Sequence, residues 1–228
     1  MNAAPSQLRP DLAVIAEQVT PGSRVLDIGC GDGALMRALR DKQCDVRGVE
    51  IDGASVERCV AQGLSVVQGD ADRDLAEYPD KGFDYAVLSQ TLQTAVRPDR
   101  MLDELLRVGS RAFVSFPNFA HWRTRAALMF GGRMPVTGAL PLSWYATENI
   151  HHVTIDDFRA LLGDLPPTNW LLRNRHVGDH RNAACGGLDH AADDLFVLVM
   201  GQRRAFAGRA DGHQPVAPLV DVPVDKLF

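Results

Sequence analysis

The stretch from Ser23 to Arg40, SRVLDIGCGDGALMRALR, constrains the fold more than any other part of the chain. A short apolar run ends at Asp27, and Gly29, Gly31 and Gly33 fall within the next six positions. A pattern with the period of a helix begins directly after the third glycine. Glycine adopts backbone conformations that are closed to other residues, and it lets the backbone approach a ligand closely. The stretch therefore predicts a strand, a tight turn beside a ligand and a helix.

Short apolar strands and amphipathic helices alternate along the rest of the chain. Strands separated by single helices pair in parallel through right-handed crossovers, which favours an α/β fold with a doubly wound, mostly parallel seven-stranded sheet. We expect strands at 23–28, 45–51, 64–69, 83–90, 111–116, 169–177 and 194–202. We expect helices at 12–19, 34–41, 54–62 and 97–108, and a last helix capped by Thr154 with Asp157 at its third position.

Residues 1–203 are expected to form one ligand-binding domain with an insertion at 117–153, which we interpret as a lid or a partner-binding segment. Residues 204–228 are rich in Pro, Gly and Ala without a sustained period, which is typical of a flexible tail. The net charge of −5 argues against a general nucleic-acid or anionic-membrane binder. No apolar run is long enough to span a membrane. No secretory signal or paired cysteine spacing is visible, so we expect a cytoplasmic location.

The carboxylates around the turn indicate which ligand it binds. The glycines follow a G-x-G-x-G pattern, and Asp27, just before them, would repel a pyrophosphate but attract an ammonium or sulfonium group. Glu50 ends the second strand, where an acid can accept hydrogen bonds from both hydroxyls of a ribose. Asp70 follows the third strand, where it can meet an adenine amino group. Together these features predict S-adenosylmethionine, with contacts from Asp27, Gly29, Cys30, Gly31, Gly33, Glu50, Ile51, Asp70 and Ala71.

This segment and the later FDYAVLSQTLQ resemble the cofactor motifs of class I methyltransferases. The resemblance implies a Rossmann-like fold, with Ser89 and Gln90 beside the cofactor and its reacting methyl group. It also implies S-adenosylhomocysteine as product or inhibitor. A nicotinamide-dependent oxidoreductase is the remaining cofactor alternative, and Asp27 opposes the pyrophosphate that such a cofactor carries.

A narrower resemblance extends over most of the chain. The pieces LRPDL, VLDIGCGDGALM, SQTLQ, LLRVG, FPNFAHWR, GRMPV, LPLSWYATENIH and VTIDDF are similar to the MetW family of bacterial methionine biosynthesis. Generic small methyltransferases lack the long insertion that these pieces include. The resemblance implies a partnership with homoserine O-acyltransferase, and it leaves open whether that enzyme is an O-acetyltransferase or an O-succinyltransferase.

The insertion also holds the candidate contacts to a substrate or partner, although no catalytic residue is recognisable. Methyl transfer needs in-line geometry and a desolvated acceptor, so the lack of a general base decides nothing. Each candidate has an alternative in lid packing, core packing or a solvated basic face. The candidates are Asn118, His121, Trp122, Arg123, Trp144, Tyr145 and His151.

A metal site is not expected. His176 and His180 stand four residues apart, with Cys185 and His190 nearby. Gly178 and the loop-like composition of this segment argue against a preformed site.

Two functions therefore remain. The chain is either a subunit that activates its partner, with the cofactor as a signal of methionine supply, or a methyltransferase acting on an unidentified acceptor.

Overall fold

The computed structural model describes residues 8–137, 140–163, 169–173 and 195–201. The expected tail at 204–228 and the four residues weighed as metal ligands, His176, His180, Cys185 and His190, lie outside these ranges.

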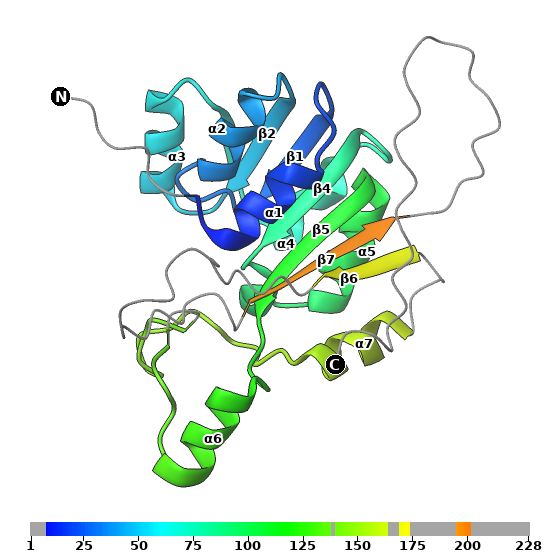
Figure 1. Ribbon diagram of the computed structural model, residues 1–228. Helices are drawn as coiled ribbons and strands as arrows, with labels where there is room; N and C mark the ends of the chain where they lie inside the picture. The colour runs from blue at the N-terminus through cyan, green and yellow to red at the C-terminus, as the bar shows by residue number, and fades with distance from the viewer. Residues whose placement is uncertain (1–7, 138–139, 164–168, 174–194, 202–228) are drawn as a thin grey trace, which may run out of the picture.

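The described strands form one sheet in the order β3-β2-β1-β4-β5-β7-β6 (Figure 1). Strands β1 to β5 pair in parallel, and β7 is antiparallel to both β5 and β6. This arrangement confirms the doubly wound, mostly parallel α/β fold. The strands are β1 (Arg24–Ile28), β2 (Asp45–Glu50), β3 (Ser65–Gln68), β4 (Phe83–Ser89), β5 (Gly109–Pro117), β6 (Asn169–Arg173) and β7 (Leu195–Gly201).

Helices connect the strands and cover both faces of the sheet (Figure 1). They are α1 (Pro10–Gln18), α2 (Ala34–Arg40), α3 (Gly53–Ala61), α4 (Ala71–Asp74), α5 (Pro98–Val108), α6 (Trp122–Gly131) and α7 (Ile155–Gly163), with 3-10 turns η1 (Leu75–Glu77) and η2 (Leu92–Thr94). The five expected helices are present, within two residues of their predicted starts. Thr154 caps α7 as predicted, because its Oγ1 accepts a hydrogen bond from the Asp157 N–H at 3.1 Å.

The core has two layers because successive side chains of a strand point to opposite faces of the sheet. Val25 of β1 packs with Ile15 of α1 on one face, in the layer that also holds α2. Its neighbour Leu26 belongs to the opposite layer with Leu102 of α5 and Phe158 of α7. The central strands are therefore buried on both faces, which explains why they read as continuous apolar runs.

The strand order places a ligand crevice at the ends of two particular strands. From β1 the chain proceeds outward to β2 and β3, and then returns to β4 on the other side of β1. The connections that follow β1 and β4 therefore diverge, and in doubly wound sheets ligands bind at this switch point, outside the carboxyl ends of the strands. Gly29 follows β1 and Gln90 follows β4 at this edge.

Candidate functional site

A cavity of about 310 Å³ lies at the carboxyl end of β1. Its wall is formed by the glycine turn, the start of α2, the end of β4 and the segment that leads into α1. The lining residues are Leu8, Arg9, Leu12, Asp27, Gly29, Cys30, Gly31, Asp32, Ala34, Leu35 and Ser89. The cavity thus occupies the place that the glycine pattern predicted.

The three glycines have positive φ angles of 70°, 55° and 78°, which residues with a side chain rarely adopt. A Cβ on Gly29 would stand 2.4 Å from Oγ1 of Thr91, and one on Gly33 would stand 2.4 Å from Cδ1 of Leu64. A Cβ on Gly31 would meet no atom within 4 Å. Gly29 and Gly33 are therefore required by packing, whereas Gly31 keeps the cavity wall bare.

Glu50 holds this turn in place from the end of β2. Its Oε2 accepts a hydrogen bond from the Gly31 N–H at 2.7 Å, and its Oε1 accepts one from the Asp52 N–H at 2.9 Å. The side chain is buried against the cavity wall without being part of it. Each carboxylate oxygen can accept a second hydrogen bond, so Glu50 remains able to receive a ligand hydroxyl.

Asp27 lines the cavity and is only 2% exposed. Burial is the main cause that raises the pKa of its carboxyl from 3.8 to about 7. The Arg9 guanidinium lowers this pKa, whereas the nearby Glu50 and Asp11 carboxylates raise it further. The carboxyl is therefore poised to become an anion when a cationic ligand group approaches.

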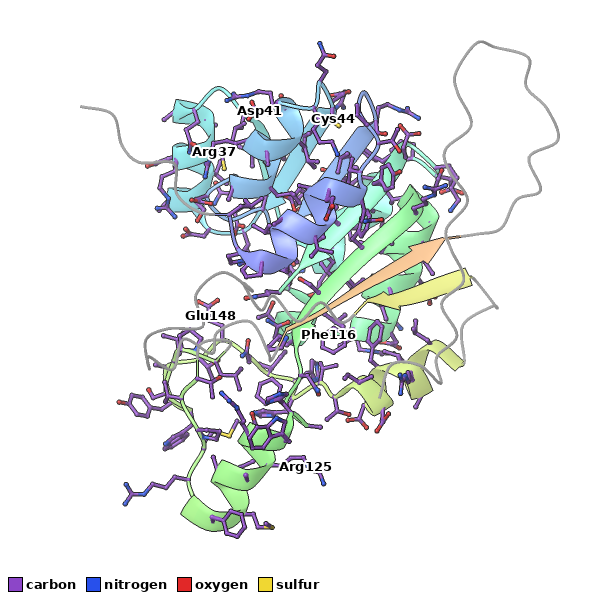
Figure 2. All side chains as sticks on the ribbon, in the orientation of Figure 1. Arg37, Asp41, Cys44, Phe116, Arg125 and Glu148 are labelled. Atoms are coloured by element: carbon purple, nitrogen blue, oxygen red, sulfur yellow. The ribbon has the colours of Figure 1, made fainter. Side chains whose placement is uncertain are left out.

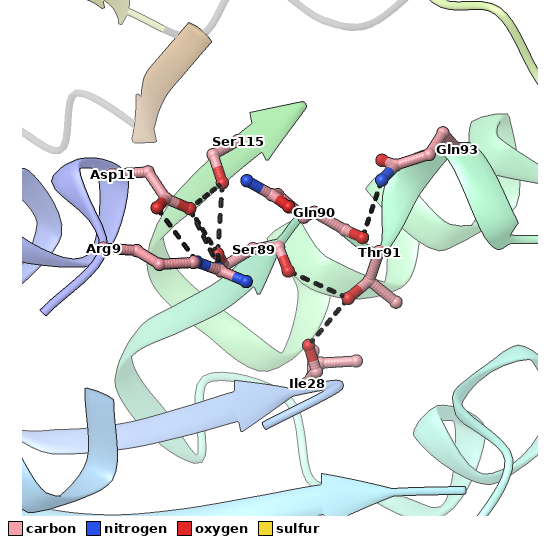
Figure 3. A network of polar contacts seen from close by, with 8 residues as sticks. All are labelled: Arg9, Asp11, Ile28, Ser89, Gln90, Thr91, Gln93 and Ser115. Atoms are coloured by element: carbon pink, nitrogen blue, oxygen red, sulfur yellow. Dashed lines mark hydrogen bonds and ion pairs between the residues drawn. The ribbon is translucent and has the colours of Figure 1, made fainter. Parts of the chain in front are cut away.

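Arg9 joins the cavity to a buried polar network (Figure 3). Its guanidinium donates two hydrogen bonds to Asp11, at 3.2 and 3.1 Å, and one to Oγ of Ser89 at 2.6 Å. Oδ2 of Asp11 also accepts hydrogen bonds from the hydroxyls of Ser89, at 2.7 Å, and Ser115, at 2.9 Å. The network ties α1 to the ends of β4 and β5.

Arg9 and Asp11 were not predicted as site residues. Both belong to the LRPDL piece, which contributes only to the family resemblance. Their roles depend on contacts with Ser89, 80 and 78 positions away. No local pattern carries that information.

The predicted cofactor residues are divided by the structure. Asp27, Gly29, Cys30, Gly31 and Ser89 line the cavity. Outside its wall lie Gly33, Glu50, Ile51, Asp70, Ala71 and Gln90. Asp70 caps α4 by accepting a hydrogen bond from the Asp72 N–H at 3.1 Å. Burial raises the pKa of the Cys30 thiol well above its ordinary value, so this cysteine is a space-filling wall residue.

None of the candidate contacts in the insertion lines this cavity. Trp122, Trp144 and Tyr145 are 65%, 74% and 76% exposed. The Asn118 side chain accepts a hydrogen bond from the Ala120 N–H at 3.1 Å, which stabilises its own turn. The His151 N–H binds the carbonyl of Gln93 at 3.0 Å. His121 precedes α6, and Arg123 lies on it. The interpretation of the insertion as a lid or a partner-binding segment stays a prediction.

The described residues contain no group of three or more His, Cys, Asp or Glu side chains placed to hold a metal ion. Among the helices of the same residues, none combines the length and the apolar character that crossing a bilayer requires.

Comparisons with known proteins show the family to which the chain is related. The model of the family described as methionine biosynthesis protein MetW matches residues 9–183. A bifunctional methionine biosynthesis protein MetXA/MetW from Rhodopirellula baltica is 37% identical over 175 residues, which cover 72% of this chain and 28% of that protein. A ubiquinone biosynthesis O-methyltransferase from Xylella fastidiosa is 34% identical over 173 residues, covering 72% of this chain and 64% of that enzyme. The chain thus spans less than two thirds of either relative.

A solved structure shows the same fold. The S-adenosylmethionine-dependent methyltransferase from Mesorhizobium loti superposes with a TM-score of 0.61 at 19% identity, over 84% of this chain and 95% of that one. At this identity the likeness concerns the fold alone.

Proposed function

Because the chain belongs to the MetW family of methionine biosynthesis proteins, we propose that it binds S-adenosylmethionine and activates a homoserine O-acyltransferase. The observation that carries the cofactor proposal is a cavity at the switch point with one buried carboxylate, Asp27, and one guanidinium, Arg9, in its wall. The free thiols of Cys30, Cys44 and Cys59 fit a reducing compartment, and we propose the cytoplasm.

The residues present fit this cofactor. Its amino-acid end carries an ammonium and a carboxylate, and the cavity offers Asp27 and Arg9 as the opposite charges. Glu50 would receive the ribose hydroxyls on its remaining lone pairs. Bound there, the cofactor would supply a sulfonium methyl group. The residues of this chain would only bind and orient it.

The partner proposal is supported by the composition of one relative. The Rhodopirellula baltica protein has a MetXA component joined to MetW, and this chain covers 28% of its length. Most of that protein therefore lies outside the MetW-like unit. Two units that are joined in one protein commonly act together, and we infer that this chain acts with a separate enzyme.

Two measurements test the proposal. Calorimetry should show S-adenosylmethionine binding to the purified chain, no binding of a nicotinamide dinucleotide, and strong loss of binding in Asp27→Ala or Glu50→Ala. Adding the chain to the homoserine O-acyltransferase of the same cell should raise the rate of acyl transfer. Binding of the dinucleotide in place of S-adenosylmethionine would refute the cofactor half, and an unchanged rate would refute the partner half.

A second candidate is a methyltransferase with an unidentified acceptor. It is favoured by the Xylella fastidiosa relative, which is named as an O-methyltransferase and is 34% identical. This candidate predicts release of S-adenosylhomocysteine with a small-molecule or protein fraction of cell extract, abolished by Glu50→Ala. Tight cofactor binding without turnover in any fraction would exclude it.

A further inference from the structure

Exposed apolar side chains of the described residues gather in one part of the molecule. Nine of the thirteen large apolar side chains that are exposed lie between positions 122 and 150. We name the described residues of this segment, 122–137 and 140–150, the arm. Figure 1 shows α6, at its start, projecting away from the sheet (Figure 1). A concentration of exposed apolar surface of this kind marks a site of interaction.

The arm receives little support from its own domain. Within α6 the only buried residue is Thr124, whereas Met129 and Phe130 are 72% and 82% exposed. A helix of ten residues is marginal in water unless one of its faces packs against something. Figure 2 shows Arg125 on α6 and Glu148 in the following loop, both away from the sheet (Figure 2). The exposed apolar side chains of the arm are therefore left open to solvent by the described part of the chain.

The net charge of the arm indicates which kind of surface would cover it. The arm contains Arg123, Arg125 and Arg133 and one acidic residue, Glu148, so its formal charge is +2. The whole chain carries −5, which leaves −7 on the remainder. A symmetric contact between two arms would set +2 against +2, which disfavours a second copy in that arrangement. An apolar patch with acidic residues at its rim is the complementary surface.

The residue types are those of a protein-binding surface. Tryptophan, tyrosine, methionine and arginine are enriched where proteins bind one another. The Arg123 guanidinium lies 5.2 Å from the ring centre of Trp122, and the rings of Trp144 and Tyr145 pack edge to face at 5.6 Å. These contacts hold the aromatic side chains in place at the surface, which reduces the entropy lost on binding.

The base of the arm is attached to the loop beside the cavity. The carbonyl of Gln93 accepts hydrogen bonds from the N–H groups of Ile150 and His151, both at 3.0 Å. The side-chain Nε2 of Gln93 donates to the carbonyl of Gln90 at 2.8 Å, one residue after Ser89 of the cavity wall. This joint at Gln93 thus connects the arm to the loop that follows Ser89. Two buried polar atoms of the joint, Oε1 of Gln93 and Nε2 of His151, lack a hydrogen-bond partner.

We propose that the arm is the docking surface for an apolar, acid-rimmed patch of a partner protein. This inference rests on the proposed function, because the partner is the acyltransferase proposed above. The surface includes Trp122, Met129, Phe130, Trp144 and Tyr145, with Arg125 supplying positive charge.

The test compares variants of the arm with matched variants elsewhere. Phe130→Ser and Trp144→Ser change side chains that are 82% and 74% exposed, so the fold should survive. Combined, they should weaken acyltransferase binding at least tenfold, measured by biolayer interferometry with the full chain. Val60→Ser, at a side chain that is 59% exposed on α3, should leave the affinity unchanged.

Charge is tested in the same way. Arg125→Glu should weaken binding severalfold, and Arg100→Glu on α5 should not. The effect of Arg125→Glu should shrink as salt is raised, because added ions screen the contact.

The outcomes separate this inference from the proposed function. If the wild-type chain activates the acyltransferase and the arm variants do so equally well, the docking surface is refuted and the proposed function stands. If the wild-type chain neither binds nor activates the enzyme, both are refuted. Arm-dependent dimerisation in sedimentation velocity, or arm-dependent binding to phosphatidylglycerol vesicles with unchanged acyltransferase affinity, would overturn the inference in favour of those occupants.

Discussion

At the residue scale, Arg9 connects stability with binding, because it neutralises Asp11 and also lines the cavity. Arg9→Ala would leave the Asp11 carboxylate, 1% exposed, with only the hydroxyls of Ser89 and Ser115. Hydrogen bonds to charged groups contribute about 1.5–3 kcal/mol, so we expect a loss of that order in urea unfolding. Arg9→Lys keeps the charge without the forked geometry and should recover part of it. Equal stability of Arg9→Ala and wild type would contradict this role.

Asp27 predicts a pH dependence of stability. Its pKa rises from 3.8 to about 7 on folding, so folding favours the protonated form. Its stabilising contribution is therefore fully present below about pH 4 and is lost as the pH rises through about 7. A shift of this size corresponds to about 4 kcal/mol at 1.36 kcal/mol for each pKa unit.

The variant Asp27→Asn isolates this contribution. Urea unfolding of both proteins at pH 4.5, 6 and 8 should show the wild type losing stability relative to Asp27→Asn as the pH rises. A difference between the two proteins that stays constant across these values would refute the assignment.

At the scale of an element, two glycines in the turn between β1 and α2 have different roles. Gly33 is required by packing, and Gly31 keeps the cavity wall free for a ligand. Gly33→Ala places a Cβ 2.4 Å from Leu64 at a φ of 78°, so both strain and overlap oppose folding, and we expect a loss of about 2 kcal/mol or more. The Cβ that Gly31→Ala adds meets no atom within 4 Å. We therefore expect only backbone strain to lower the free energy of unfolding, by about 1 kcal/mol.

Cofactor affinity should depend on Gly31, although this residue matters less than Gly33 for stability. Gly31→Ala adds a methyl group to the cavity wall and should weaken S-adenosylmethionine binding at least tenfold while the protein remains folded. Thermal melts and calorimetry on both variants give the comparison. Unchanged cofactor affinity in Gly31→Ala would show that the ligand lies elsewhere.

Helices with one face in the core were predictable, and the other helices were not. The apolar residues of α5 follow the helical period because Met101, Leu102 and Leu105 all face the sheet. Helix α6 was not predicted, because its apolar residues do not fall on one buried face. The α4 helix and the 3-10 turns each span four residues or fewer, which is too short for a periodic pattern.

At the scale of the whole molecule, the joint at Gln93 predicts coupling between cofactor and partner. If the partner docks on the arm, it should change cofactor affinity by the same factor by which the cofactor changes partner affinity. Gln93→Met removes the side-chain hydrogen bond to the Gln90 carbonyl and should reduce this factor toward one. Its affinity for each ligand alone should change much less.

Calorimetric titration of cofactor with and without the acyltransferase, for wild type and Gln93→Met, measures both quantities. Val60→Ser, at an exposed side chain of α3, serves as the control. Identical cofactor dissociation constants in the presence and absence of the partner would remove the signalling role and leave docking intact.

The sequence by itself determined the α/β order, the glycine turn and the placement of Asp27 and Glu50 at the ends of neighbouring strands. It could do so because hydrophobic periodicity and glycine spacing are local, and parallel pairing brings the ends of strands to one edge. Only the tertiary structure decided that Arg9 enters the cavity and that Asp11 joins Ser115, 104 positions away. It also decided that none of the aromatic candidates of the insertion lines that cavity. Contacts between distant segments depend on how the layers pack, and no short-range pattern records that packing.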